Sequence, residues 1–112
     1  MKEKDIQRAI LDLLAAKHIL AFRMNSGTAI KSYGGKTRAI TFGVPGMADI
    51  LAFPQLKITT DARVIVAPFP VWIEVKGDSK QSDLQKSFQA QVEAEGHRYI
   101  LARSIEDVEA IL

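Results

Sequence analysis

The segment that decides the fold reads Val71-Trp72-Ile73-Glu74-Val75-Lys76-Gly77. It predicts a β-strand over residues 71–76, because β-branched and aromatic residues dominate it and Gly77 ends it. Alternate residues of a strand share a face, so one face is apolar and the other carries Trp72, Glu74 and Lys76. Buried charges are costly unless they are paired or bind a metal. Glu74 and Lys76 therefore indicate either an ion pair at a strand edge or a functional site.

A second carboxylate favours the functional site. Asp49 leads into an apolar strand in Gly46-Met47-Ala48-Asp49-Ile50-Leu51-Ala52-Phe53. Two carboxylates at adjacent strand ends suit Mg²⁺ or Mn²⁺, which prefer oxygen ligands, and the backbone carbonyl of Val75 can add another oxygen. A metal held in this way polarises a phosphoryl oxygen and activates water, and Lys76 can stabilise the developing charge.

The length indicates one domain over residues 1–112. The apolar fraction of 47% and the charged fraction of 25% are typical of soluble globular proteins. No cysteine is present, which excludes disulfides and thiolate metal sites. No apolar run approaches the ~20 residues that span a bilayer, so we expect no membrane association. The N-terminus shows no signal peptide, and we expect a cytoplasmic protein of a bacterium or a phage-infected cell.

Positive charge is concentrated in one part of the chain. Between Asp12 and Asp49 the sequence contains no acidic residue. The basic residues of this segment are Lys17, Arg23, Lys31, Lys36 and Arg38. Such a segment suits a polyanion such as nucleic acid, although a solvated loop whose charges keep the protein soluble is the alternative.

The remaining pattern predicts the order αβββ-excursion-βαβα, a central mixed sheet with helices on both faces. Helices are expected over residues 3–17, 82–95 and 104–112, and strands over 18–24, 38–42, 49–53, 71–76 and 97–102. Residues 29–37 are expected to form a mobile loop. Residues 54–70 are expected to form an excursion in which 56–59 can pair with 63–67. Ser82 with Gln85, and Ser104, are expected helix caps.

Two polar residues at helix starts allow two interpretations each. Glu3 fits an acidic first turn favoured by the helix dipole, and spacing alone prefers this role to that of a third carboxylate at the site. Gln85 can cap its helix or hydrogen-bond a water or phosphate, and capping is at least as well supported.

Asp49 followed by Glu74-Val75-Lys76 resembles the PD-(D/E)xK nuclease superfamily. More narrowly, an ordered set of motifs is similar to the virus-type replication-repair nuclease (VRR-NUC) family. The set is Asn25-Ser26-Gly27, Gly43-Val44-Pro45-Gly46-Met47-Ala48-Asp49-Ile50, Trp72 to Lys76, Ser82-Asp83-Leu84-Gln85-Lys86-Ser87-Phe88 and Gly96-His97-Arg98-Tyr99. The resemblance covers nearly the whole chain. Ala48 stands where the superfamily has Pro.

The resemblance implies a restriction-endonuclease-like core and a divalent-metal-dependent DNA endonuclease. It implies Asp49 and Glu74 as metal ligands, Lys76 as the catalytic lysine, Gln85 as the glutamine of the following helix, and Glu3 as the first-helix acid and a further ligand. The last assignment reverses the preference from spacing. We assign Arg23, Asn25, Ser26, Lys31, Lys36 and Arg38 to DNA binding.

Small stand-alone members of viral or phage type are similar to homodimeric junction-cleaving enzymes. We therefore expect a homodimer that resolves four-way (Holliday) junctions in DNA repair, because a symmetric dimer presents two sites to two strands. The alternatives are a non-catalytic DNA-binding module on the same fold and an endonuclease acting on RNA. The presence of Asp49, Glu74 and Lys76 together favours catalysis over the binding module.

Overall fold

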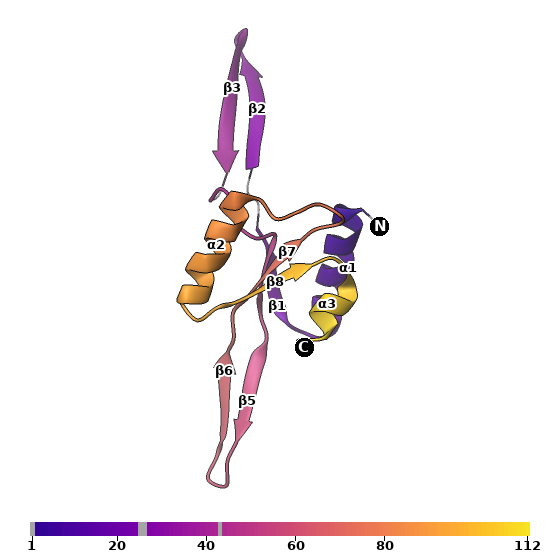
Figure 1. Ribbon diagram of the computed structural model, residues 1–112, viewed down its shortest axis with the longest axis vertical. Helices are drawn as coiled ribbons and strands as arrows, with labels where there is room; N and C mark the ends of the chain where they lie inside the picture. Colours follow the sequence, from indigo (N-terminus) through magenta and orange to yellow (C-terminus); the bar gives the residue numbers. More distant parts are fainter. Residues whose placement is uncertain (1, 25–26, 43) are drawn as a thin grey trace.

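The computed structural model describes residues 2–24, 27–42 and 44–112, without the side chains of 27–33 and 37–42. It is an α/β fold around a four-stranded mixed sheet in the order β1-β4-β7-β8 (Figure 1). The strands of this sheet are β1 (Leu20–Arg23), β4 (Ile50–Phe53), β7 (Val71–Val75) and β8 (Arg98–Ala102). The helices are α1 (Glu3–Ala16), α2 (Asp83–Ala94) and α3 (Ile105–Glu109). β4 pairs antiparallel with both β1 and β7, and β8 runs parallel to β7 after the α2 crossover.

β7 is the central strand, and its two faces belong to different parts of the core. Val71, Ile73 and Val75 pack with α1 and α3, whose buried residues include Ile10, Leu14 and Val108. The opposite face packs against α2, where the rings of Trp72 and Phe88 meet edge-to-face with centroids 5.0 Å apart. The predicted division of the strand into two faces is confirmed, and helices cover both.

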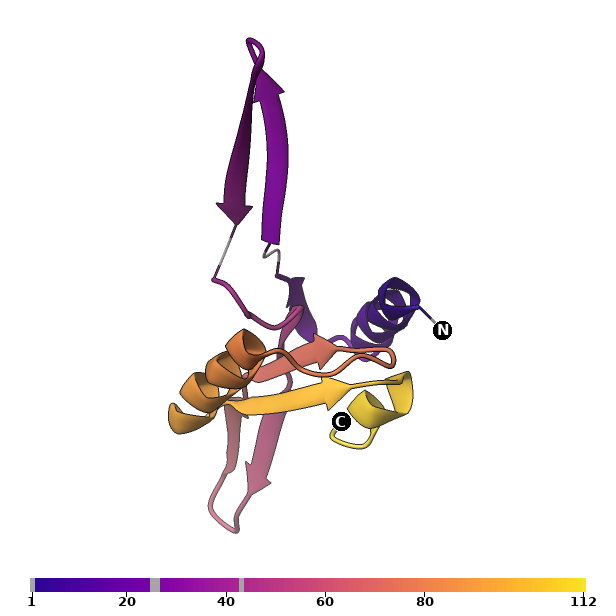
Figure 2. The ribbon, with the colours of Figure 1, turned by 45° about the horizontal axis from the view of Figure 1, so that its top comes forward.

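Two hairpins leave this core in opposite directions (Figures 1 and 2). They are β2 (Gly27–Tyr33) with β3 (Lys36–Phe42), and β5 (Gln55–Thr59) with β6 (Val64–Pro68). The radius of gyration is 16.9 Å and the longest dimension 68 Å, against about 13 Å expected for the radius of gyration of a compact chain of this length. The hairpins are therefore extended arms and not part of the core.

The prediction of a mobile loop over residues 29–37 was wrong, because these residues form most of the β2–β3 hairpin. Its turn is Gly34-Gly35, with φ of 56° and 79°. A two-residue turn with both φ values positive matches the twist of the flanking strands, which is why Gly-Gly favours a hairpin. The predicted pairing of 56–59 with 63–67 is confirmed in β5–β6.

The C-terminal helix is shorter than predicted and is capped differently. α3 ends at Glu109, and the Ser104 side chain makes no capping hydrogen bond. Asp107 instead turns back, and its Oδ2 accepts a hydrogen bond of 2.8 Å from the Arg103 N–H. Within the described ranges, no helix has the length and apolar character needed to cross a membrane.

Candidate metal site

Asp49 reaches the end of β7 because the loop before β4 is held against α2. Gly46 in this loop has φ 82°, and a Cβ there would lie 2.4 Å from the Leu84 carbonyl oxygen. Only glycine allows this approach. The loop then delivers Asp49, whose Oδ2 accepts a 2.7 Å hydrogen bond from the Val75 N–H.

Glu74 is the one charged residue among the buried side chains of the described chain, at 3% exposure. Its Oε1 accepts a 2.8 Å hydrogen bond from Gln85 Nε2. Its Oε2 is buried and has no hydrogen-bond donor among the described residues. Half of this carboxylate therefore lacks the compensation that a buried charge requires.

Gln85 caps its helix, as predicted, and its side chain also contacts Glu74. Its Oε1 accepts from the Ser82 N–H at 2.8 Å, and Ser82 Oγ accepts from the Gln85 N–H at 3.2 Å. This reciprocal pair is the predicted capping box. The Gln85 Nε2 remains free to hold Glu74, so the start of α2 is tied to the site.

The environment raises the pKa of both carboxyls. Burial raises the pKa of Glu74 to about 8, and the neighbouring Asp49 carboxylate adds to the shift. Burial also raises the pKa of Asp49, opposed by the hydrogen bond from the Val75 N–H. The charge of Lys76 lowers the pKa of both carboxyls. Two neighbouring carboxylates, one of them buried, resist ionising together, and a bound cation would relieve their repulsion.

The backbone of β7 places a further oxygen beside this pair. The Lys76 N–H donates to the Ala102 carbonyl on the β8 side of the strand. The N–H and C=O of one strand residue point to the same side, opposite to those of the next residue. The Val75 N–H donates to Asp49, so the Val75 carbonyl also faces the Asp49 side.

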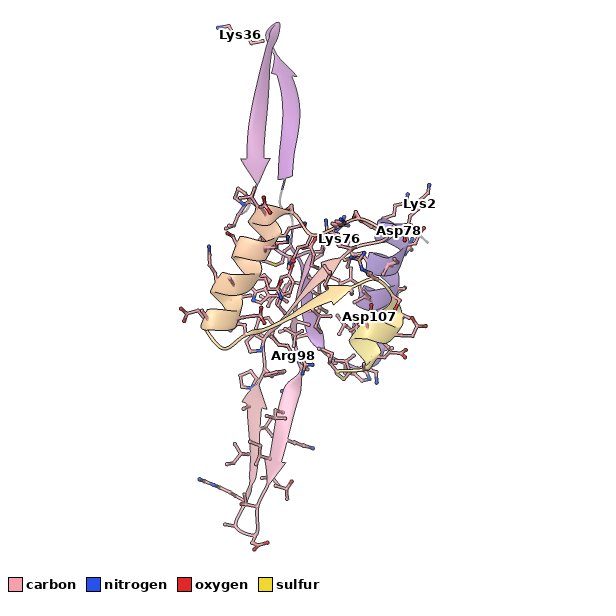
Figure 3. All side chains as sticks on the ribbon, viewed as in Figure 1. Lys2, Lys36, Lys76, Asp78, Arg98 and Asp107 are labelled. Atoms are coloured by element: carbon pink, nitrogen blue, oxygen red, sulfur yellow. The ribbon has the colours of Figure 1, made fainter. Side chains whose placement is uncertain are left out.

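Lys76 follows β7 directly and is half-buried, and the loop after it is held from two sides (Figure 3). Glu3 Oε1 accepts hydrogen bonds from the Gly77 N–H at 3.1 Å and from Ser79 Oγ at 2.8 Å. Arg103 Nη1 donates to the carbonyls of Gly77 and Ser79 at 2.8 and 2.9 Å. We call these contacts the loop clamp. Sequence reasoning missed Arg103 and Ser79, because the contacts join residues 24 to 76 positions apart and leave no local pattern.

The structure does not bring Glu3 into a cluster with the other two acids. Across residues 2–24, 27–42 and 44–112, no three acidic, histidine or cysteine side chains are close enough to hold a metal together. The Gly77 N–H, followed by the Ser79 hydroxyl, lowers the pKa of Glu3. Its negative charge contributes to raising the pKa of both Asp49 and Glu74. Glu3 therefore affects the Asp49 and Glu74 carboxyls through its negative charge, and it holds the loop after Lys76 as part of the loop clamp.

The predicted DNA-binding residues lie on two parts of the molecule. Arg23 is exposed and lines a groove of about 430 Å³ along α1, together with Lys4, Asp5 and Arg8, which sequence reasoning did not single out. Lys36 lies at the far end of the β2–β3 arm (Figure 3), and Lys31 pairs with Arg38 across the two strands. Asn25 and Ser26 lie outside the described residues. Comparisons of the chain with protein families, characterised proteins and solved structures find no match.

Proposed function

We propose that this chain is a divalent-metal-dependent DNA endonuclease of the VRR-NUC family, with a restriction-endonuclease-like core. The observation that carries the proposal is the carboxylate pair of Asp49 and Glu74, in which Glu74 Oε2 is buried and finds no donor in the part of the chain that the structure describes. Lys76 follows on the same strand end, and Gln85 orients Glu74 from the next helix. The mixed sheet with helices on both faces suits this core.

The residues present fit Mg²⁺ or Mn²⁺. Asp49 and Glu74 offer carboxylate oxygens, the Val75 carbonyl faces the same side, and hard cations prefer such ligands. A cation beside Glu74 Oε2 removes both the repulsion between the carboxylates and the cost of an unpaired buried oxygen. When bound, the cation polarises the phosphodiester and lowers the pKa of water.

The chain's own residues position the phosphate and keep the ligands in place. Lys76 provides a cation toward the oxygens that gain negative charge as the phosphorus–oxygen bond breaks. Gln85 fixes the orientation of Glu74 through its 2.8 Å hydrogen bond. The loop clamp holds the backbone on which Lys76 stands, because Glu3 and Arg103 bind the residues that follow it.

The basic residues are suited to the DNA backbone. Arg23, Lys4 and Arg8 line a groove along α1, the helix whose Glu3 contacts the loop after Lys76. Phosphate contacts of this kind fix register and orientation without reading sequence. A structure-selective enzyme needs this mode of binding, and a homodimer with two such sites can cut opposite strands of a four-way junction.

The test is cleavage of a labelled four-way junction, beside matching duplex, single-stranded DNA and RNA, with Mg²⁺, Mn²⁺ or EDTA. We expect metal-dependent, paired nicks in the junction, and loss of cleavage by at least about 10³-fold in Glu74→Ala. DNA binding in Glu74→Ala should stay within about threefold, because the basic residues make the phosphate contacts.

Three results would contradict the proposal in different ways. Junction binding without cleavage in either metal would indicate a non-catalytic binding module. Cleavage of RNA but not of DNA would indicate an RNA-directed enzyme. Unchanged cleavage in Asp49→Ala or Glu74→Ala would show that the carboxylate pair is not the site.

A further inference from the structure

The β5–β6 arm exposes an apolar face that lacks a covering surface in the described structure. Cross-strand register places Leu56 opposite Ala67 and Ile58 opposite Ile65, so these four residues share one face. Leu56, Ile58 and Ile65 are 51%, 45% and 37% exposed. A two-stranded hairpin is marginally stable alone in water. The arm therefore favours packing against another surface.

The base of the arm adjoins a groove of about 840 Å³ that is lined by both apolar and polar residues. The apolar residues that line it are Ile19, Leu20, Phe53, Phe69, Ile111 and Leu112. Leu56 also lines this groove, so the groove and the apolar face of the arm form one continuous surface. Lys17 and Arg98 add positive charge to it.

The tip of the same arm is an ordered turn that exposes one carboxylate. Thr60 and Arg63 close the turn, with the Thr60 N–H donating to the Arg63 carbonyl at 2.9 Å and the Arg63 N–H donating to Thr60 Oγ1 at 3.2 Å. Asp61 and Arg63 are both exposed in this turn, so the tip carries one charge of each sign. The Asp61 carboxylate is therefore available to a basic surface such as the groove at the other end of the arm.

We propose that the β5–β6 arms of two copies of this chain pack face to face and antiparallel about a two-fold axis. Each tip then reaches the groove of the other copy, where Asp61 meets Lys17 and Arg98. The Asp61 carboxylate and the basic groove lie one arm length apart, about 17 Å for a five-residue strand. The surface is therefore complementary to itself, as an isologous dimer requires.

The area available is sufficient for a dimer. The five most exposed apolar residues of this surface are Leu20, Leu56, Ile58, Ile65 and Leu112. They offer roughly 400 Å² of apolar area per copy. Because interfaces are about 60% apolar, each copy would bury roughly 700 Å² of polar and apolar surface together. Stable complexes bury roughly 600 to 1,000 Å² per partner, a range that includes this value. The proposal rests on the proposed function only in that it takes a second copy of the chain as the partner. It uses none of the chemistry of the metal site.

The test measures the oligomeric state by sedimentation, without metal or DNA. We expect a dimer for the unaltered chain, and a dimer dissociation constant raised at least about 100-fold in Ile58→Asp. Thr59→Asp is the matched control, because it adds the same charge at the next residue on the opposite face and should change the constant less than about threefold. Equal melting temperatures of the core in all three proteins check that folding is intact.

A charge exchange tests the contact between tip and groove. Asp61→Arg and Arg98→Asp should each weaken the dimer, and the double variant should recover most of the loss. A monomeric unaltered chain, a dimeric Ile58→Asp, dissociation by Thr59→Asp to the same degree, or no recovery in the double variant would each overturn the proposal. None of these results tests the chemistry of the metal site, and loss of cleavage in Glu74→Ala leaves the dimer unaffected.

Discussion

Glu74 combines a functional position with a thermodynamic cost. A buried carboxyl whose pKa is raised in the folded protein binds a proton that the unfolded chain releases. The stability that Glu74 contributes to the metal-free protein is therefore fully present below the ordinary pKa of 4.5 and is lost as the pH rises toward about 8, the pKa in the folded protein. Asp49 acts with the same sign, because its pKa is also raised.

The first prediction concerns this pH dependence. In EDTA, the free energy of unfolding should fall by several kcal/mol, on the order of 4, between pH 5 and pH 8.5. Denaturant unfolding measured across this range checks the sign. Glu74→Gln should flatten most of the dependence, because the amide does not titrate. An increase in stability over the same range would show that Glu74 is ionised in the folded protein without metal.

Variants of Glu3 test whether this acid at the start of α1 serves the loop clamp or binds a metal. In the structure, Glu3 Oε1 acts as an acceptor for Gly77 and Ser79, a role that an amide oxygen can fill. We predict that Glu3→Gln keeps kcat within about threefold. Glu3→Ala and Arg103→Ala should each lower kcat about tenfold or more at unchanged metal affinity, because Lys76 loses its position. If Glu3→Gln is as inactive as Asp49→Ala, Glu3 is a metal ligand.

For helices and strands, sequence patterns predicted the features that residues close together in the chain determine. The alternation in Val71–Val75 predicted both faces of β7, and Ser82 with Gln85 predicted the start of α2. The contacts that join distant elements left no such pattern. Gly46 is an example: its need for glycine comes from the backbone of α2, which lies 38 residues further along the chain at Leu84.

The β2–β3 arm shows how composition can mislead. Its residues are polar and basic, which favoured a loop. Gly34-Gly35 is nevertheless a turn that joins two strands of seven residues each. The register places Lys31 directly opposite Arg38. Two basic positions at one level of the arm suit the binding of a polyanion.

The arm therefore carries the third prediction. The double variant Lys31→Gln with Arg38→Gln should weaken DNA binding, and the slope of log affinity against log salt should fall by about one for each lost phosphate contact. Lys57→Gln on the β5–β6 arm is the control and should leave the slope unchanged. Cleavage at saturating DNA should persist, because the metal ligands are untouched. A salt slope equal to that of the unaltered chain would remove the arm from the DNA interface.

The two arms make the whole molecule more extended than its core, and they differ in chemistry. One arm is basic and is expected to contact DNA, and the other is apolar and is proposed to join two copies. The arms point in opposite directions from the sheet (Figure 1). Dimerisation through β5–β6 therefore leaves the β2–β3 arms and the metal sites of both copies free.

This arrangement predicts how the oligomeric state controls the outcome of cleavage. A dimer holds two sites on one junction and can cut both strands within a single binding event, whereas a monomer must dissociate and rebind between cuts. On a supercoiled plasmid with an extruded cruciform, the unaltered chain should yield linear product directly. Ile58→Asp should yield nicked circles, because the cruciform is lost once the first nick releases supercoiling. Thr59→Asp should behave like the unaltered chain. Direct linear product from Ile58→Asp under conditions where it sediments as a monomer would show that paired cutting does not depend on the β5–β6 interface.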